Sequence, residues 1–197
     1  MQLVLASSSE SRKKQLQQLN IPFECCSPGI DETQLEHESA QNLVLRLAKE
    51  KAYAVSEKFN AHVIIAGDQI HIVGREIHGK PGDFATALQQ LNKAQGQVTE
   101  FLSGIAVLNT ITGKLFLQLV TTKVTFKQLS ESTIKKYLEI DQPYECAGGI
   151  RIEGLAPCLI ESIEAPDPTA ITGMPLVICC QMLSAAGFDC IEHATLV

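Results

Sequence analysis

The chain has 197 residues, 45% of them hydrophobic and 19% charged, and its 22 acidic and 16 basic residues give a net charge of −6. This composition is typical of a globular protein and excludes a wholly disordered chain, a collagen-like repeat and a coiled coil. The negative charge has the wrong sign for binding a nucleic-acid polymer, and no apolar run approaches the roughly 18 residues of a membrane-spanning helix. We expect one cytoplasmic domain over residues 1–197, with no membrane segment, and the sequence leaves a monomer or a homodimer open.

The N-terminal segment predicts a short apolar strand over residues 2–6, a serine-rich loop, and a basic amphipathic helix over residues 10–19. Ser8 or Ser9 is placed to cap that helix. Serine hydroxyls, helix-start amides and cations that follow a strand would form a cradle for an anion. A solvated basic first turn with serine caps explains the same pattern, so both interpretations stay open.

A second short strand is expected over residues 23–27, followed by a loop and a long helix over residues 39–58 with an apolar stripe at 3.6-residue spacing. Lys51 projects within this stripe, so its side chain either reaches the surface or points into a cleft. In the loop, Asp31 and Glu32 are either solvated charges or hard oxygen ligands for Mg²⁺. The residues alone do not choose between these alternatives.

A buried strand over residues 62–67 is expected to end at Asp68, and residues 69–73 continue with period-two alternation. Open α/β sheets bind ligands at strand ends, which makes Asp68 a candidate site residue, although a turn aspartate has the same pattern. Lys80 stands between glycine and proline, where a tight backbone could aim it, but such a tripeptide is also a common turn. The histidines nearby lack metal-ligand spacing, and we assign them no catalytic role.

The second half of the chain mixes helices with long strands. We expect a helix capped by Asp83 and ending near Ala94, a hairpin of strands 98–109 and 114–126, a helix over 130–140, strands over 144–152 and 155–163, and a final helix from Pro175 to about Ala186. Seven cysteines, including the vicinal pairs Cys25–Cys26 and Cys179–Cys180, form neither a disulfide framework nor a zinc pattern, and we interpret them as reduced core residues. The long hairpin excludes a purely parallel sheet, so the sequence predicts an α/β fold around a mixed, strongly twisted sheet with an elongated or two-lobed shape.

Taken together, the candidate residues supply carboxylates for a metal and a water, and cations for a polyphosphate. No covalent nucleophile stands out. These are the components of a phosphoanhydride hydrolase.

Six blocks in this order resemble the Maf family of nucleoside triphosphate pyrophosphatases, and they cover nearly the whole chain. The blocks are Leu5-Ala-Ser-Ser-Ser-Glu-Ser-Arg12, Asp31-Glu32, Leu47-Ala-Lys-Glu-Lys-Ala52, Ala66-Gly-Asp68, Gly79-Lys-Pro81 and Cys146-Ala-Gly-Gly-Ile-Arg-Ile-Glu-Gly154. The resemblance implies an ITPase-like (Maf/Ham1-type) α/β fold, in which an elongated mixed sheet with flanking helices forms two lobes around a cleft. It also implies hydrolysis of a nucleoside triphosphate to the monophosphate and pyrophosphate, with a divalent cation, Mg²⁺ or Mn²⁺.

The resemblance also implies roles for single residues. By position in the family's blocks, Asp68 would be the proton acceptor, Lys51 and Lys80 would assist catalysis, Ser7 and Arg12 would bind the substrate, and Glu32 and Asp68 would bind the metal.

Three further positions bear on which base is bound. Gln69 and Glu153 resemble the 7-methyl-GTP branch, because members that act on dTTP and UTP usually have threonine and glutamine there, and Ser11 is the third specificity position. Methylation at N7 makes guanine cationic, and the carboxylate of Glu153 can accept from its donors while favouring that charge. Glu10 and Ser11 depart from the family's pattern. The alternatives are a dTTP/UTP pyrophosphatase and a nucleotide-binding regulator linked to cell division that binds without turnover.

Overall fold

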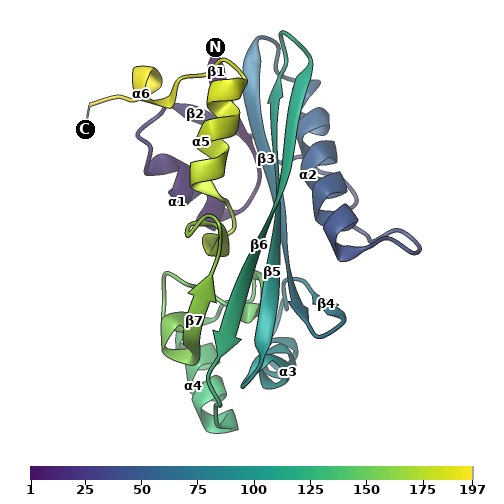
Figure 1. Cartoon of the computed structure of the whole chain (residues 1–197), viewed down its shortest axis with the longest axis vertical. Coiled ribbons are helices and arrows are strands. Elements are labelled where there is room, and N and C mark those ends of the chain that lie inside the picture. Colours follow the sequence, from purple (N-terminus) through teal and green to yellow (C-terminus); the bar gives the residue numbers. More distant parts are fainter. Residues whose placement is uncertain (197) are drawn as a thin grey trace.

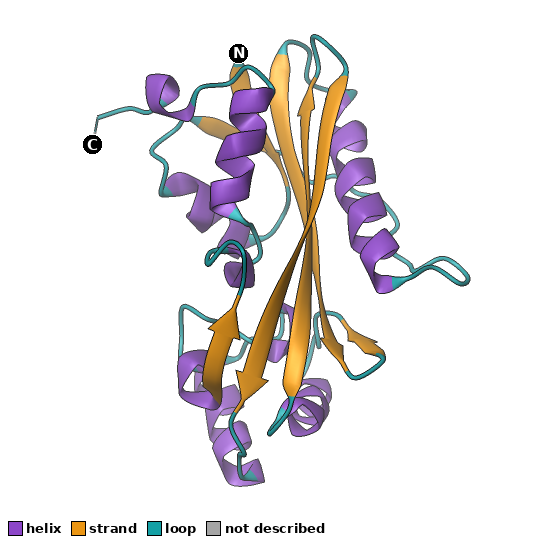
Figure 2. Cartoon of the chain, viewed as in Figure 1, coloured by secondary structure: helices purple, strands orange, loops and turns teal. Residues whose placement is uncertain are grey.

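The computed structural model describes residues 1–196, which form a seven-stranded sheet flanked by helices (Figure 2). The strands are β1 (Gln2–Ala6), β2 (Phe23–Cys25), β3 (His62–Val73), β4 (Glu76–His78), β5 (Val98–Asn109), β6 (Lys114–Phe126) and β7 (Ile160–Glu164). The α-helices are α1 (Glu10–Gln17), α2 (Ala40–Ser56), α3 (Phe84–Ala94), α4 (Glu131–Asp141), α5 (Leu176–Ala185) and α6 (Cys190–His193). Short 3₁₀ helices are η1 (Ala147–Gly149), η2 (Ala156–Leu159) and η3 (Ala170–Thr172).

The sheet is mixed and strongly twisted. Its order is β2-β1-β3-β5-β6-β7, with β4 paired to β3 beside this path. β1 runs parallel to β2 and β3, and the other pairs are antiparallel. β3, β5 and β6 run along the whole molecule, as Figure 1 shows. The predicted elongated mixed sheet is therefore confirmed.

Different helices cover the two ends of the long strands and form two lobes (Figure 1). The upper lobe contains α1, α2 and α5, and the lower lobe contains α3 and α4. In the upper lobe, alternate residues of β1 face opposite layers, because side chains of a strand alternate between faces. Leu3 and Leu5 pack with α1 and α5, whereas Val4 and Ala6 pack with α2. In the lower lobe, α3 and α4 enclose a separate core around Phe101.

The helix α2 approaches the sheet closely at Gly104 on β5. A Cβ atom at this position would lie 2.3 Å from the carbonyl oxygen of Val44, so only glycine permits this contact without movement of the helix. Gly104 pairs with Asp68 across the β3–β5 ladder. The close contact therefore brings α2 against β5 directly beside Asp68 of β3.

Most predicted elements are confirmed within a few residues. The hairpin strands have the expected bounds. Serine or aspartate side chains cap five helices as acceptors, among them Ser9 at α1 and Asp83 at α3. These elements could be predicted because capping residues and apolar patterns involve only residues that are near one another in sequence.

Four predictions about secondary structure are wrong. β3 continues through Asp68 without a break, because β5 pairs with it on both sides of that residue. Residues 144–152 form turns and η1 rather than a strand, since Gly148 and Gly149 both take left-handed φ values, of 64° and 65°. The strand expected over 155–163 begins only at Ile160, after η2. α5 is followed by α6, so it is not the final helix.

The cysteine interpretation holds in part. All seven cysteines are free thiols, and Cys179 is buried in the core between the sheet and α5. Cys25, however, is exposed at the end of β2, so its assignment to the core is wrong. No helix within residues 1–196 combines the length and apolar character that a bilayer crossing requires.

Candidate active site

A cavity of about 520 Å³ opens between the two lobes beside the centre of β3. The upper lobe contributes the serine loop after β1, the loop after β2 and part of α2, and the lower lobe contributes Ile77, Gly79 and Lys80 around the end of β4. Asp68 and Gln69 lie between these two sets of residues on β3. The cavity thus collects most of the residues predicted for the site.

Lys51 lies between two carboxylates. Its Nζ is 2.7 Å from Oδ1 of Asp68 and 2.8 Å from Oε1 of Glu32. Lys51 and Asp68 are buried, whereas the Glu32 side chain is 58% exposed on its loop. The lysine side chain therefore points into the cleft and does not reach the surface, which decides between the two alternatives left open by the sequence.

Asp68 was expected at a strand end, and the topology explains its actual place. β1 pairs in parallel with β3 only as far as Ala6, which stands opposite Ala66. Asp68 therefore lies two residues beyond the carboxyl end of β1, although its own strand continues. Ligands of α/β sheets bind outside the carboxyl ends of parallel strands, and the neighbouring strand supplies that end here.

The serine loop forms the floor of the cavity on the side of α1. The Ser7 hydroxyl accepts from the Ser9 amide at 3.1 Å and from Nη1 of Arg12 at 3.5 Å. Arg12 also donates from Nε to the Gly173 carbonyl at 3.0 Å. Burial lowers the pKa of Arg12, and the charges of Asp68 and Glu32 oppose that shift, so the guanidinium stays cationic. This loop has the anion-binding groups that the sequence suggested.

Lys80 lies apart from the Lys51 group. Its side chain is largely exposed on the cavity wall, and its Nζ is 3.6 Å from Oε2 of Glu145. This weak exposed pair leaves the ammonium able to turn toward a bound anion.

A narrower pocket adjoins the cavity and is lined by the three residues predicted to set base specificity, Ser11, Gln69 and Glu153. Ile150, Ile152 and Ile171 form its apolar walls, and no aromatic side chain lines it within residues 1–196. Stacking of a base on an aromatic ring is therefore absent from this pocket in the described part of the chain.

Gln69 presents only an acceptor to this pocket. Its Nε2 donates to Ser103 Oγ at 3.0 Å and to the Ala170 carbonyl at 2.9 Å, which uses both amide hydrogens. The Ala170 contact also fixes the orientation of the amide, because a carbonyl can only accept. Oε1 is left facing Gly173, another lining residue, near the position that a Cβ would occupy there.

The segment 145–155, which we call the lower wall, carries Glu153 and is held by α4. Tyr137 donates its hydroxyl to the Gly149 carbonyl at 3.1 Å and accepts from the Arg151 amide at 3.0 Å. Asp141 accepts from the Leu155 amide at 2.6 Å and from Nη2 of Arg151 at 3.2 Å. Neither support was predicted from the sequence. The only signal in the sequence is that Tyr137 and Asp141 stand four residues apart and therefore share one face of the helix.

The carboxylates fit a divalent cation of the Mg²⁺ type. Glu32 and Asp68 converge on one ammonium, so their oxygens lie close together. Within the described residues, no group of three histidine, cysteine or carboxylate side chains could hold a metal without further ligands. Mg²⁺ typically takes one or two carboxylates and completes its shell with water and phosphate oxygens, which matches this donor set.

A model of the Maf-like protein family matches residues 2–186. The chain belongs to the Maf family. This Maf-family chain is 43% identical to a 7-methyl-GTP pyrophosphatase of Nitrosococcus oceani over 186 residues, which cover 94% of each protein. It is 44% identical to a 7-methyl-GTP pyrophosphatase of Pseudomonas fluorescens, over 95% of this chain and 97% of the relative.

Among solved structures, a HAM1 protein from Coxiella burnetii superposes with a TM-score of 0.50 at 14% identity. The alignment covers 94% of the Maf-family chain and 99% of the HAM1 chain. Identity this low shows a shared fold only, and the predicted Maf/Ham1-type architecture is confirmed.

Proposed function

We propose that this chain hydrolyses 7-methyl-GTP to 7-methyl-GMP and pyrophosphate with the help of Mg²⁺ or Mn²⁺. The observation that carries the proposal is the buried Asp68 carboxylate, which pairs with Lys51 in a cavity that also holds a second carboxylate and two more cations. The names of the two relatives support the same substrate.

The reaction requires a water to attack the α-phosphorus. A new bond forms from the water oxygen to this phosphorus, and the bond to the oxygen that bridges the α- and β-phosphates breaks. Asp68 accepts the proton that the water loses. Arg12, Lys51 and Lys80 offset the negative charge that develops on the leaving pyrophosphate. A divalent cation bound by Glu32 and Asp68 would neutralise further phosphate charge.

Two acceptors in the narrow pocket, which Arg12 and Lys80 also line, support a guanine base as the group that binds there. Gln69 Oε1 and the Glu153 carboxylate are both acceptors. Guanine presents donors at N1 and N2, and its N7-methylated form is cationic, so it complements both the hydrogen bonding and the charge of these two groups. Uracil and thymine present one donor, at N3, between two acceptors, whereas guanine presents two adjacent donors, so only guanine can donate to both groups.

Pyrophosphate release from 7-methyl-GTP, GTP, UTP and dTTP tests the proposal. We expect the highest kcat/KM on 7-methyl-GTP, no activity after removal of metal with EDTA, and recovery with excess Mg²⁺ or Mn²⁺. Asp68→Asn should lower kcat by at least about a hundredfold, because general-base catalysis typically contributes that much. Asp83→Asn is the matched control, since asparagine also caps a helix and Asp83 lies outside the cavity.

Three outcomes would contradict the proposal. A preference for UTP or dTTP would favour the dTTP/UTP alternative. Tight binding of 7-methyl-GTP without pyrophosphate release would favour a non-catalytic regulator. Near-normal turnover in Asp68→Asn would remove this carboxylate from the mechanism.

A further inference from the structure

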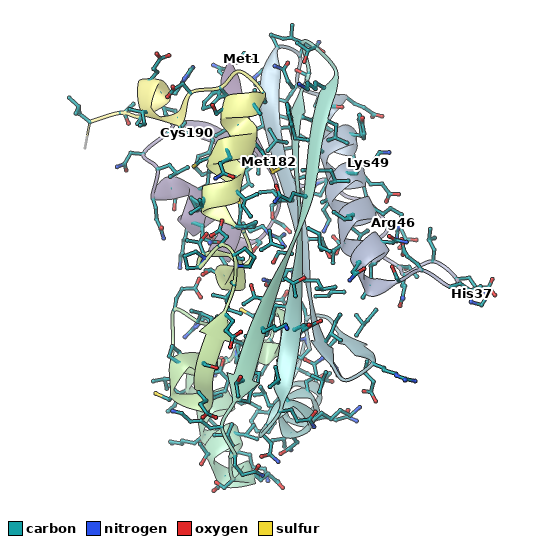
Figure 3. The ribbon with its side chains drawn as sticks, in the orientation of Figure 1. Met1, His37, Arg46, Lys49, Met182 and Cys190 are labelled. Carbon is teal, nitrogen blue, oxygen red and sulfur yellow. The ribbon has the colours of Figure 1, made fainter. Side chains whose placement is uncertain are left out.

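The Glu32 carboxylate is held at the site by a loop whose internal hydrogen bonds join only near neighbours in sequence. This loop, residues 31–38, is part of the connection 26–39 between β2 and α2 and projects from the upper lobe, with His37 at its outer end (Figure 3). Within the loop, Thr33 donates its amide to Asp31 Oδ1 at 2.9 Å, and Leu35 donates its amide to Glu38 Oε2 at 3.1 Å. Gln34 donates Nε2 to the Glu38 carbonyl at 2.7 Å, and the Glu38 amide donates to the Leu35 carbonyl at 3.1 Å. Most of its residues are exposed. An exposed loop of this kind loses substantial backbone entropy when it is fixed in one conformation.

Arg46 on α2 fastens both ends of this loop. Its Nε and Nη2 donate to the two carboxylate oxygens of Glu38 at 2.7 and 2.9 Å, in a bidentate ion pair. Nη2 also donates to the Thr33 carbonyl at 3.0 Å. The side chains of Arg46 and Glu38 are only 19% and 8% exposed, which distinguishes this pair from ordinary surface ion pairs. Figure 3 places Arg46 where the projecting loop meets the helix.

The Thr33 contact connects Arg46 with the active site. Thr33 follows Glu32 directly, so a hydrogen bond to its carbonyl restrains the backbone from which the Glu32 side chain extends. Glu32 then reaches Lys51 Nζ at 2.8 Å. Arg46 and Lys51 both belong to α2, five residues apart, so one helix holds the loop and also carries the ammonium that receives its carboxylate.

We propose that Arg46 is a positioning residue that fixes the loop 31–38 and thereby places the Glu32 carboxylate beside Lys51 and Asp68, an inference that rests on the proposed metal-dependent pyrophosphatase function. Arg46 acts through the loop and touches neither phosphate nor metal. Its loss should weaken use of the divalent cation more than it slows the chemical step. Supporting contacts around metal ligands typically change metal affinity by about 10- to 100-fold.

Four variants test this role. Arg46→Met removes the fork and keeps a strong helix former. Arg46→Lys keeps the charge but cannot bind Glu38 in a bidentate manner and Thr33 at the same time. Glu38→Ala removes the loop's half of the pair. Glu50→Gln is the matched control, because Glu50 also pairs with Arg46, at 3.0 Å, but lies on α2 itself and holds no part of the loop.

The first readout is amide hydrogen exchange in the metal-free protein, which does not depend on activity. We expect exchange over residues 31–38 at least tenfold faster in Arg46→Met and Glu38→Ala, with β3 unchanged. Arg46→Lys should be intermediate, and Glu50→Gln should match wild type. The double variant Arg46→Met/Glu38→Ala should show no more than the larger single effect, because both changes break the same contact.

The second readout is the Mg²⁺ dependence of 7-methyl-GTP hydrolysis. The half-saturating Mg²⁺ concentration should rise at least tenfold in Arg46→Met, with kcat at saturating Mg²⁺ within about threefold of wild type. Unchanged exchange in the loop, or a Mg²⁺ shift no larger than that of Glu50→Gln, would overturn the role of Arg46. If wild-type protein hydrolyses no triphosphate, the proposed function is wrong, and the exchange data still decide whether Arg46 orders the loop.

Discussion

The loop 31–38 lines the cavity and the lower wall lines the adjoining narrow pocket; each carries a carboxylate predicted for the site, but the two segments are held in different ways. The loop 31–38 carries Glu32 and is fastened at the surface by one arginine fork. The lower wall carries Glu153 and is tied into the lower-lobe core by the Tyr137 and Asp141 hydrogen bonds. The Arg46–Glu38 ion pair can be broken without disturbing a hydrophobic core, whereas the hydrogen bonds that hold the lower wall cannot. Substitutions behind the loop should therefore change metal use, and substitutions behind the lower wall should change stability.

We expect the largest effect at low pH, where the buried His71 beside the lower wall lowers the stability of the folded protein. This side chain is fully buried and stacks on Phe101 with ring centroids 4.2 Å apart, and a Cβ on Gly148 would lie 2.3 Å from its Nδ1. Burial, together with the nearby His78, lowers the pKa of His71 to about 3. The ordinary histidine pKa is about 6.5, so below that pH the unfolded chain binds a proton that the folded protein does not.

Stability should therefore fall as the pH drops from about 6.5 toward 3, by up to about 1.4 kcal/mol per pH unit. Urea unfolding at pH 7.5 and pH 4.5 should show a loss of about 2–3 kcal/mol from this group. His71→Leu should remove most of this dependence, because both ring nitrogens lack partners and an apolar replacement leaves nothing unsatisfied. A smaller slope should remain, since burial also lowers the pKa of His78. An unchanged slope in His71→Leu would show that other groups cause the acid sensitivity.

The next effect concerns the support of the lower wall by α4. Asp141→Ala leaves the Leu155 amide without its acceptor in a part-buried position, and unfolding free energy should fall by about 1–3 kcal/mol. The control on the same helix is Glu139→Ala, whose side chain is exposed and should have little effect. Glu38→Ala should be much less destabilising than Asp141→Ala, despite breaking a shorter ion pair. Equal losses of stability from these two variants would remove the proposed difference between the two sides of the cavity.

The smallest effect sharpens the role of the lower wall in base selection. Glu153→Gln replaces one acceptor by a donor, which faces a guanine donor and leaves both unpaired. The fall in kcat/KM for 7-methyl-GTP should be roughly tenfold or more, with a smaller loss or a gain for UTP and dTTP. Glu164→Gln, an exposed change on β7, serves as control. Equal losses on all three substrates would mean that Glu153 serves the fold or the metal and not the base.

The sequence predicted the elements whose signals are local. The apolar stripe of α2, the capping residues and the long hairpin depend on neighbours within one or two turns or on alternation along a strand. The lower wall shows where this fails. Its apolar residues suggested a strand, but Gly148 and Gly149 turn the backbone against His71 and α4, and these contacts come from residues far away in sequence.

The candidate site shows the same division. The residues in the cavity, such as Lys51 and Asp68, could be named from family blocks, and periodicity even placed Lys51 on the buried face of its helix. The residues that hold them in place could not be named. In the sequence pattern Arg46 resembles an ordinary surface arginine, and Asp141 resembles an exposed residue at the end of a helix. Their contacts with Thr33 and Leu155 appear only in the tertiary structure. The donors of Gln69 are used by Ser103 and Ala170, a fact that only the tertiary structure supplies.

The unbroken course of β3, β5 and β6 limits how this enzyme can open and close. Proteins with two separate domains usually move about a few linker residues, but here the three longest strands pass from one lobe to the other with their ladders intact (Figure 2). A rigid-body change in the width of the cleft must therefore come from a change in sheet twist. Asp68 lies at the middle of β3, close to the axis of such a twist. A change in twist would therefore displace the ends of the lobes more than the carboxylate that we propose as the proton acceptor.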